Sequence, residues 1–286
     1  GSTGCGKSTL GKTLMMLEHA TGGHVFFNYD NEFRDITAFN KKEMFDFRRK
    51  VQMVFQDPYS ALNPQKKIYT SFEEPLKVHG ISLQEEREAR MRQVLSMVNI
   101  QPDYLMRYPH EFSGGQRQRI GIARALAVEP SLIIADEPVS ALDVSIQAQV
   151  LNLLNELKHD LDLTYIFVAH DLSVVEYISD RVGVMYLGNF VEVGEKEKIY
   201  SNPMHPYTQA LLSAVPVPDP TAKRERILLE GSIPSAHKPP TGCKFHTRCP
   251  KCMECCKTQA PERYEVDDGH YVYCHLYDKE RREQQK

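Results

Sequence analysis

The first nine residues contain the chemistry of a phosphate-binding loop. They read Gly1-Ser2-Thr3-Gly4-Cys5-Gly6-Lys7-Ser8-Thr9 and match the pattern G-x-x-x-x-G-K-[ST]. Glycines let the backbone wrap around phosphates, and the helix that follows adds the positive end of its dipole. In this pattern Lys7 contacts the β- and γ-phosphates and the Ser8 hydroxyl is a ligand of Mg²⁺. Cys5 is interpreted as a small packing residue.

A pair of carboxylates supplies the second half of such a site. Asp136 and Glu137 directly follow the apolar run Leu132-Ile-Ile-Ala. A strand there delivers both side chains to the carboxyl edge of a sheet, where open α/β sheets bind ligands. We expect Asp136 to hold Mg²⁺ and Glu137 to orient and polarise the attacking water. The alternative is a solvated strand end without a catalytic role.

The stretch Phe112-Ser113-Gly114-Gly115-Gln116 opens a further predicted helix, expected over residues 116–127. A serine with two glycines at a helix start forms a second anion-binding terminus. Since the phosphate loop already holds one side of the γ-phosphate, a second such terminus is useful when it closes over nucleotide bound to another subunit. The alternative is an ordinary helix N-cap.

The elements that must position these motifs follow from hydrophobic periodicity. Strands are predicted over 24–29, 51–55, 132–135, 165–169 and 182–187, with helices over 41–50, 85–97, 145–157 and 172–178. Alternating strands and helices with apolar strands favour a parallel sheet covered on both faces. No apolar run approaches the roughly 20 residues that cross a bilayer. A membrane role would therefore be peripheral.

Composition divides the chain of 286 residues into three parts. A nucleotide-binding core is expected over 1–57 and 129–200, and a helical subdomain punctuated by prolines over 58–128. From about residue 201 the sequence becomes proline-rich, which predicts an irregular extension over 201–286. The net charge of −3 gives no bulk electrostatic reason to bind nucleic acid.

Together these motifs resemble those of ATP-binding cassette (ABC) ATPases, in the order of that family. Ser113-Gly-Gly-Gln is similar to its signature, Gln56 to its Q-loop glutamine, Ser140-Ala-Leu-Asp143 to its D-loop and His170 to its switch histidine. The resemblance implies a P-loop NTPase fold with a RecA-like core and ATP as substrate. It further implies head-to-tail dimers, in which Ser113–Gln116 complete the partner's site. Lys7, Gln56, Glu137 and His170 would be the catalytic residues, and Gln56 would also be a ligand of Mg²⁺.

The C-terminal part resembles that of ATPases from bacterial oligopeptide and dipeptide importers. The resemblance rests on Asn202-Pro-Met-His-Pro-Tyr207 and on the cysteine spacing. Within that family the F-type subunit is favoured by two further segments, Pro216–Pro220 and Gly231–Ser235. It implies a D-type ATPase as partner, with a homodimer as alternative, and two transmembrane permease subunits. It also implies indirect cooperation with an extracytoplasmic peptide-binding protein and a place at the cytoplasmic face of the bacterial membrane.

Six of the seven cysteines lie between Cys243 and Cys274, which favours a metal site. The resemblance implies a [4Fe–4S] cluster on four of them, namely Cys243, Cys249, Cys256 and Cys274. A local ferredoxin-like set, Cys249-x2-Cys252-x2-Cys255, competes with it. Zinc is the alternative metal, held by Cys243, Cys249, Cys252 and Cys256 or with His246.

Three rival functions remain open at this stage. The same ATPase type could energise import of another solute such as nickel, or act in a soluble ABC ATPase on nucleic acid or ribosomes. A non-catalytic metal-sensing subunit is the third, and the presence of Glu137 and His170 argues against it. The family also has strands and an adenine-stacking aromatic before the phosphate loop. We therefore expect the chain, as written, to bind ATP weakly and to have low stability.

Overall fold

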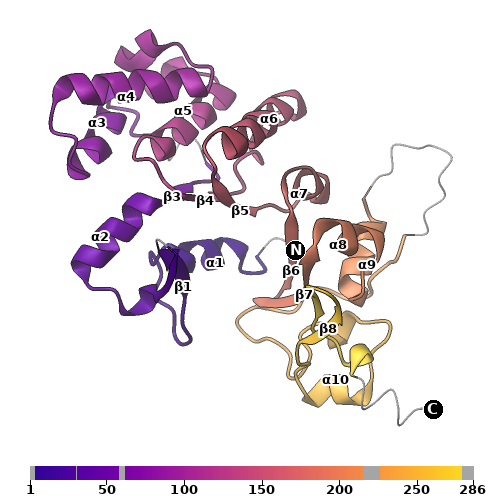
Figure 1. Cartoon of the computed structure of the whole chain (residues 1–286). Coiled ribbons are helices and arrows are strands. Elements are labelled where there is room, and N and C mark those ends of the chain that lie inside the picture. Colours follow the sequence, from indigo (N-terminus) through magenta and orange to yellow (C-terminus); the bar gives the residue numbers. More distant parts are fainter. Residues whose placement is uncertain (1–3, 30, 58–61, 216–225, 279–286) are drawn as a thin grey trace. The chain divides into compact units, whose positions relative to one another are not determined.

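The computed structural model describes residues 4–29, 31–57, 62–215 and 226–278 (Figure 1). Its contacts divide the chain into two compact units, one of residues 8–169 and one of residues 1–7 with 170–286. The expected phosphate-loop residues Gly1, Ser2 and Thr3 and the motif Pro216–Pro220 lie outside the described residues. The three-part division by composition stays a prediction, because these two units do not test it.

The unit of residues 8–169 is built on a parallel sheet. The strands β3 (Val51–Val54), β4 (Leu132–Asp136) and β5 (Thr164–Val168) pair side by side in this order. Val51 pairs with Leu132 and Asp136 with Val168, so the carboxyl ends share one edge. The central strand is apolar up to Ala135 because it is buried. The predicted parallel sheet is confirmed for these strands.

Helices and one hairpin complete this unit. They are α1 (Lys7–Leu14), which begins at the unit boundary, the hairpin β1 (Phe26–Tyr29) and β2 (Glu32–Asp35), α2 (Lys41–Lys50), α3 (Ile68–Val78), α4 (Gln84–Met97), α5 (Gly114–Leu126) and α6 (Val144–Asp160). Short 3₁₀ turns span Ile36–Ala38, Pro102–Met106 and Pro109–Glu111. The described part of residues 58–128 contains no strand, as predicted. α4 buries Met91, Val94 and Leu95 at helical spacing.

The second unit contains an antiparallel sheet. Its strands are β6 (Arg181–Tyr186), β7 (Asn189–Glu195), β8 (Tyr264–Asp267) and β9 (His270–Val272), in the order β6-β7-β9-β8. Its helices are α7 (Leu172–Ile178), α8 (Lys196–Ser201), α9 (Pro206–Ser213) and α10 (Glu254–Thr258), with 3₁₀ turns His246–Arg248 and His275–Tyr277. Figure 1 draws this unit in brown to yellow.

Two expectations are corrected here. The strands predicted over 24–29 and 182–187 are present as β1 and β6, but they pair antiparallel with β2 and β7 and so lie outside the parallel ladder. The extension after residue 201 is not simply irregular, because β9 pairs with β7 and β8 pairs with β9. The turn between β8 and β9 contains Asp268 and Gly269, and Gly269 has φ +65°. Such an Asp-Gly pair is a strong hairpin signal.

Candidate nucleotide site and cysteine-rich segment

A hydrogen bond joins the phosphate-loop pattern to the strand that carries the carboxylates. The Ser8 hydroxyl in the first turn of α1 donates to Asp136 Oδ1 over 2.9 Å. Asp136, at the end of β4, is 5% exposed. Helix α1 comes close to β4, since a Cβ atom on Gly11 would meet Ile134 at 3.3 Å. A hydroxyl and a carboxylate this close are hard oxygen donors of the kind Mg²⁺ prefers.

Glu137 lies at the junction of three strand ends. Its backbone N–H donates to Val168 O at the end of β5 over 2.9 Å. Its carboxylate Oε2 accepts a hydrogen bond of 3.1 Å from Gln56 Nε2, which follows β3. The parallel register therefore brings together two predicted catalytic residues that are 81 positions apart.

The described part of the phosphate loop in the other unit is tightly turned. Gly4 and Gly6 have φ +76° and +96°, in the region that glycine enters without strain. The Gly188 N–H donates to Cys5 O over 2.8 Å, and Cys5 is 2% exposed. The Lys7 ammonium contacts Cys5 Sγ at 3.8 Å. Burial of Cys5 agrees with its interpretation as a packing residue.

His170 follows β5 along the chain and is exposed. Its neighbour Asp171 is the N-cap of α7, where it accepts a hydrogen bond from the Ser173 N–H over 2.8 Å. His170 and Lys7 belong to one unit, and Ser8, Gln56, Asp136 and Glu137 belong to the other.

The serine–glycine stretch begins α5 two residues earlier than expected, at Gly114. Ser113 is the N-cap: its hydroxyl accepts from the Gln116 N–H, and its own N–H donates to the Gln116 side chain. A Cβ atom on Gly115 would lie 2.4 Å from Ile146 of α6. This capping geometry is common to an ordinary N-cap and to an anion-binding terminus. Close packing against α6 is a separate reason for glycine at position 115.

The cysteines of the C-terminal extension do not form a ready-made metal site. All six are free thiols, and in the described residues no three Cys, His, Asp or Glu side chains are grouped closely enough to hold a metal ion. The donor chemistry nevertheless suits soft metals. Burial raises the pKa of Cys274 to about 12, with smaller contributions from Cys243, Cys249 and Cys256. The four expected ligands are therefore electrostatic neighbours.

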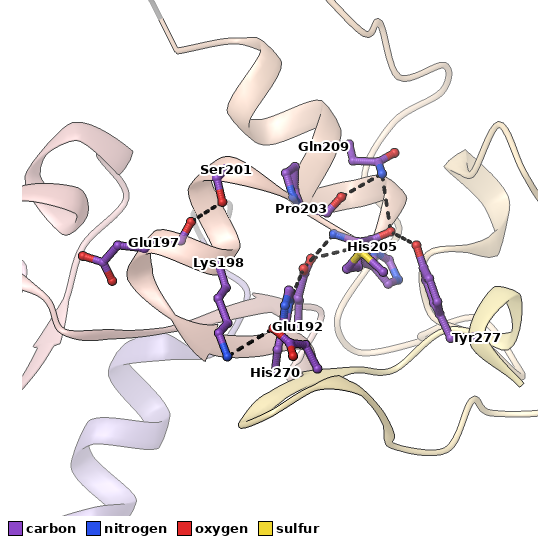
Figure 2. Close-up of polar contacts among 11 residues, drawn as sticks. Glu192, Glu197, Lys198, Ser201, Pro203, His205, Gln209, His270 and Tyr277 are labelled. Carbon is purple, nitrogen blue, oxygen red and sulfur yellow. Dashed lines mark hydrogen bonds and ion pairs between the residues drawn. The ribbon is translucent and has the colours of Figure 1, made fainter.

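A buried polar centre, which sequence analysis missed, lies in the antiparallel sheet (Figure 2). Glu192 of β7 is fully buried and accepts hydrogen bonds from the Met204 N–H at 2.7 Å, the His205 N–H at 2.9 Å and His270 Nε2 at 2.8 Å. The His205 Nδ1 in turn accepts from the Tyr207 N–H at the start of α9. The sequence did contain one signal of this buried centre, because Glu192 stands between Val191 and Val193 in an apolar stretch.

Two family models match the chain. The model described as ABC transporter matches residues 1–140, and the one described as oligopeptide/dipeptide transporter, C-terminal region, matches residues 191–256. In the described residues, no helix has the length and apolar character needed to cross a bilayer.

Named relatives and solved structures match most of the chain. The oligopeptide transport ATP-binding protein AppF of Bacillus subtilis is 53% identical over 97% of this chain and 84% of its own length. A putative peptide import ATP-binding protein of Brucella ovis is 50% identical over 96% of this chain and 85% of its own length. The dimeric ATP-binding cassette MJ0796, bound to ADP and Pi, superposes with a TM-score of 0.59 at 31% identity, over 68% of this chain and 82% of its own. The structure of cbiO1 from Clostridium perfringens superposes with a TM-score of 0.61 at 29% identity. The match covers 71% of this chain and 77% of cbiO1.

Proposed function

Because this chain belongs to the ATP-binding subunits of ABC transporters, and within them to the oligopeptide transport branch, we propose that it hydrolyses ATP to power peptide import. The observation that carries the proposal is the Ser8–Asp136 hydrogen bond, which joins the phosphate-binding loop to the carboxylate strand. A chance glycine-rich turn would have no reason to meet that carboxylate.

In this proposal the residues of the nucleotide site divide the work of binding. The backbone of residues 1–9 cradles the phosphates, and Lys7 neutralises charge on the β- and γ-phosphates. Ser8 and Asp136 would hold Mg²⁺, and Gln56 would be a further ligand. The metal, when bound, draws charge from the phosphate oxygens and holds the triphosphate in place. Ser113–Gln116 of the partner subunit complete the site.

Hydrolysis then depends on side chains at the strand ends. Glu137 orients the attacking water in line with the γ-phosphate and accepts a proton from that water. Gln56 donates to the Glu137 carboxylate in the present structure, so this amide fixes the orientation of the base. His170 contacts the γ-phosphate from the switch position. Loss of the phosphate removes the bridge between subunits, and the dimer opens.

The test is Glu137→Gln in the full-length subunit assembled with its transporter. The amide keeps shape and hydrogen bonding but accepts no proton. We expect hydrolysis to fall about 10²-fold or more while ATP affinity is retained, and closed dimers to accumulate. Glu156→Gln, on the exposed face of α6, is the matched control and should hydrolyse ATP normally. Normal turnover by Glu137→Gln would remove this residue from its role.

The partners follow from the same family membership. We propose a D-type ATPase as the second subunit, with a homodimer as the alternative, and two transmembrane permease subunits that dock near Gln56. The peptide-binding protein outside the membrane acts indirectly, and the ATPase works at the cytoplasmic face. Import of another solute such as nickel would use the same ATPase. Transport assays with peptide and with nickel in the reconstituted complex separate the two.

For the cysteines we propose a [4Fe–4S] cluster on Cys243, Cys249, Cys256 and Cys274. The support for this set is that all four thiols are half-buried or buried and that Cys274 lies in electrostatic reach of the other three. Since the thiols are not grouped as a closed site, loading must draw them together, and it should raise the melting temperature. Iron, sulfide and zinc content with the visible spectrum of anaerobically purified protein distinguishes the cluster from zinc. Cys252→Ser with Cys255→Ser should retain the cluster, whereas the local ligand set predicts its loss.

A further inference from the structure

Glu137 has an unusual backbone conformation. Its φ is +47°, in the left-handed region that residues with a side chain rarely enter, and it precedes Pro138, before which extended conformations are preferred. Such a conformation persists only when surrounding contacts impose it. The direction of the Glu137 carboxylate depends on this backbone, because the side chain leaves from the same Cα atom.

Two residues hold the peptide groups on either side of that Cα atom. On the N-terminal side, the Glu137 N–H donates to Val168 O over 2.9 Å. On the C-terminal side, the Glu137 carbonyl accepts from Ser140 twice, from its N–H at 3.2 Å and from its hydroxyl Oγ at 3.0 Å. The backbone bond alone would close an ordinary turn with any residue at position 140. The hydroxyl adds a second, side-chain anchor to the same oxygen.

We propose that the Ser140 hydroxyl is a positioning group for Glu137: it fixes the carbonyl of the catalytic base and thereby aims its carboxylate. Ser140 touches no reacting atom in this scheme and acts through Glu137. The inference deepens the proposed function and rests on it, since it assigns to Ser140 a task that matters only if Glu137 is the base.

The first arm of the test compares Ser140→Ala with Ser140→Thr in the full-length subunit within its transporter. Ala removes the hydroxyl and Thr retains it. We expect kcat for ATP to fall about tenfold in Ser140→Ala, with the Kd for a non-hydrolysable ATP analogue unchanged within twofold, and kcat to return within about twofold in Ser140→Thr. Unchanged kcat in Ser140→Ala, or an equal loss in Ala and Thr, would overturn the proposal.

The second arm places Ser140→Ala in the Glu137→Gln background and measures residual hydrolysis. If Ser140 acts through Glu137, the second change adds nothing once the base is absent. A further loss in the double variant would show that Ser140 acts elsewhere, for instance on the partner's nucleotide, and would refute the inference. Full turnover by Glu137→Gln itself would instead refute the proposed function, so the two failures are distinguishable.

Discussion

The two sheets of this protein handle polar side chains in opposite ways. In the parallel sheet the strands are apolar, and the polar residues Gln56, Asp136 and Glu137 lie at or just beyond their carboxyl ends. In the antiparallel sheet the carboxylate of Glu192 lies within a strand and is fully buried. The first arrangement places carboxylates at a strand edge, where the proposed function uses them, and the second uses a carboxylate to hold segments together.

Hydrogen bonding explains why both arrangements are stable. A buried carboxylate is costly unless its oxygens are satisfied, and Glu192 receives three donors, two from residues 204 and 205 and one from His270. Glu137 is half-buried, and its carboxylate accepts a hydrogen bond of 3.1 Å from the amide of Gln56, which is exposed. In the proposed function Glu137 accepts a proton during turnover, a task for which a fully buried carboxylate with three donors, such as Glu192, is poorly suited.

The strongest test of this difference between the two sheets is to remove the buried carboxylate of Glu192. Glu192→Ala leaves His270 and two backbone N–H groups without their acceptor, and we expect the free energy of unfolding to fall by about 3–5 kcal/mol. Thermal melting, with hydrogen exchange over residues 264–278, measures it. The exposed Glu197→Ala in α8 is the control and should change stability by less than about 0.5 kcal/mol. ATP affinity of the remaining folded protein should be unaltered, and a tenfold loss would contradict the division of roles.

The converse change removes a charge from the phosphate loop. Lys7→Ala loses charge-assisted contacts to phosphate, each of about 1.5–3 kcal/mol, so ATP affinity of the full-length subunit should fall about 100-fold. Nucleotide titration measures this fall. Lys12→Ala, one turn along α1, is the control and should retain affinity. The melting temperature of the nucleotide-free Lys7→Ala protein should stay within a few degrees of the unaltered one. A large drop would show that the loop lysine is structural.

A change of one pH unit gives the smallest expected effect. Burial lowers the pKa of His205 to about 3, from an ordinary value of 6.5. The unfolded chain therefore takes up a proton that the folded chain resists between pH 6.5 and 3. The resulting stability is complete above pH 6.5 and is lost as pH falls, by at most about 1.4 kcal/mol per pH unit. Chemical denaturation at several pH values measures the slope.

A conservative variant isolates this acid effect. His205→Asn keeps an N-cap acceptor for the Tyr207 N–H but does not titrate, so the slope between pH 6.5 and 3 should shrink. In the other unit, hydrogen bonding from Thr37, with a further contribution from His24, lowers the pKa of Asp35 to about 2. The stability that this shift contributes is lost only below pH 3.8, so the region around Asp35 should loosen at a lower pH than the region around His205. The opposite order of loosening in hydrogen exchange would contradict the comparison.

Local periodicity predicted most of the parallel unit. The helix expected over 41–50 has those bounds in the structure, and the strand over 132–135 differs by one residue. Strands and helices of this kind bury one face or both, so their apolar pattern is visible in sequence. The strand-end positions of Asp136 and Glu137 followed from the same pattern, and the contact between Glu137 and Gln56 required only a parallel register.

The C-terminal extension could not be predicted in the same way. Its strands β8 and β9 are four and three residues long, too short for a clear period, although Asp268-Gly269 marked their turn. The pairing of β9 with β7 joins segments far apart in sequence, and no local pattern encodes such a partner. For the same reason, the hydrogen bond between Glu192 and His270 could not be predicted from the sequence. The hydroxyl of Ser140 was missed because its partner is a backbone carbonyl.

The separation of 78 positions between Glu192 and His270 has a consequence for biosynthesis. At about 5–20 residues per second, a ribosome adds the histidine roughly 4–16 s after the glutamate. During that interval the strand bearing Glu192 exists without its last hydrogen-bond donor. The nascent carboxylate stays hydrated until β9 emerges. A message cut short before codon 270 therefore yields a polypeptide whose second sheet cannot close, which leaves it open to proteolysis.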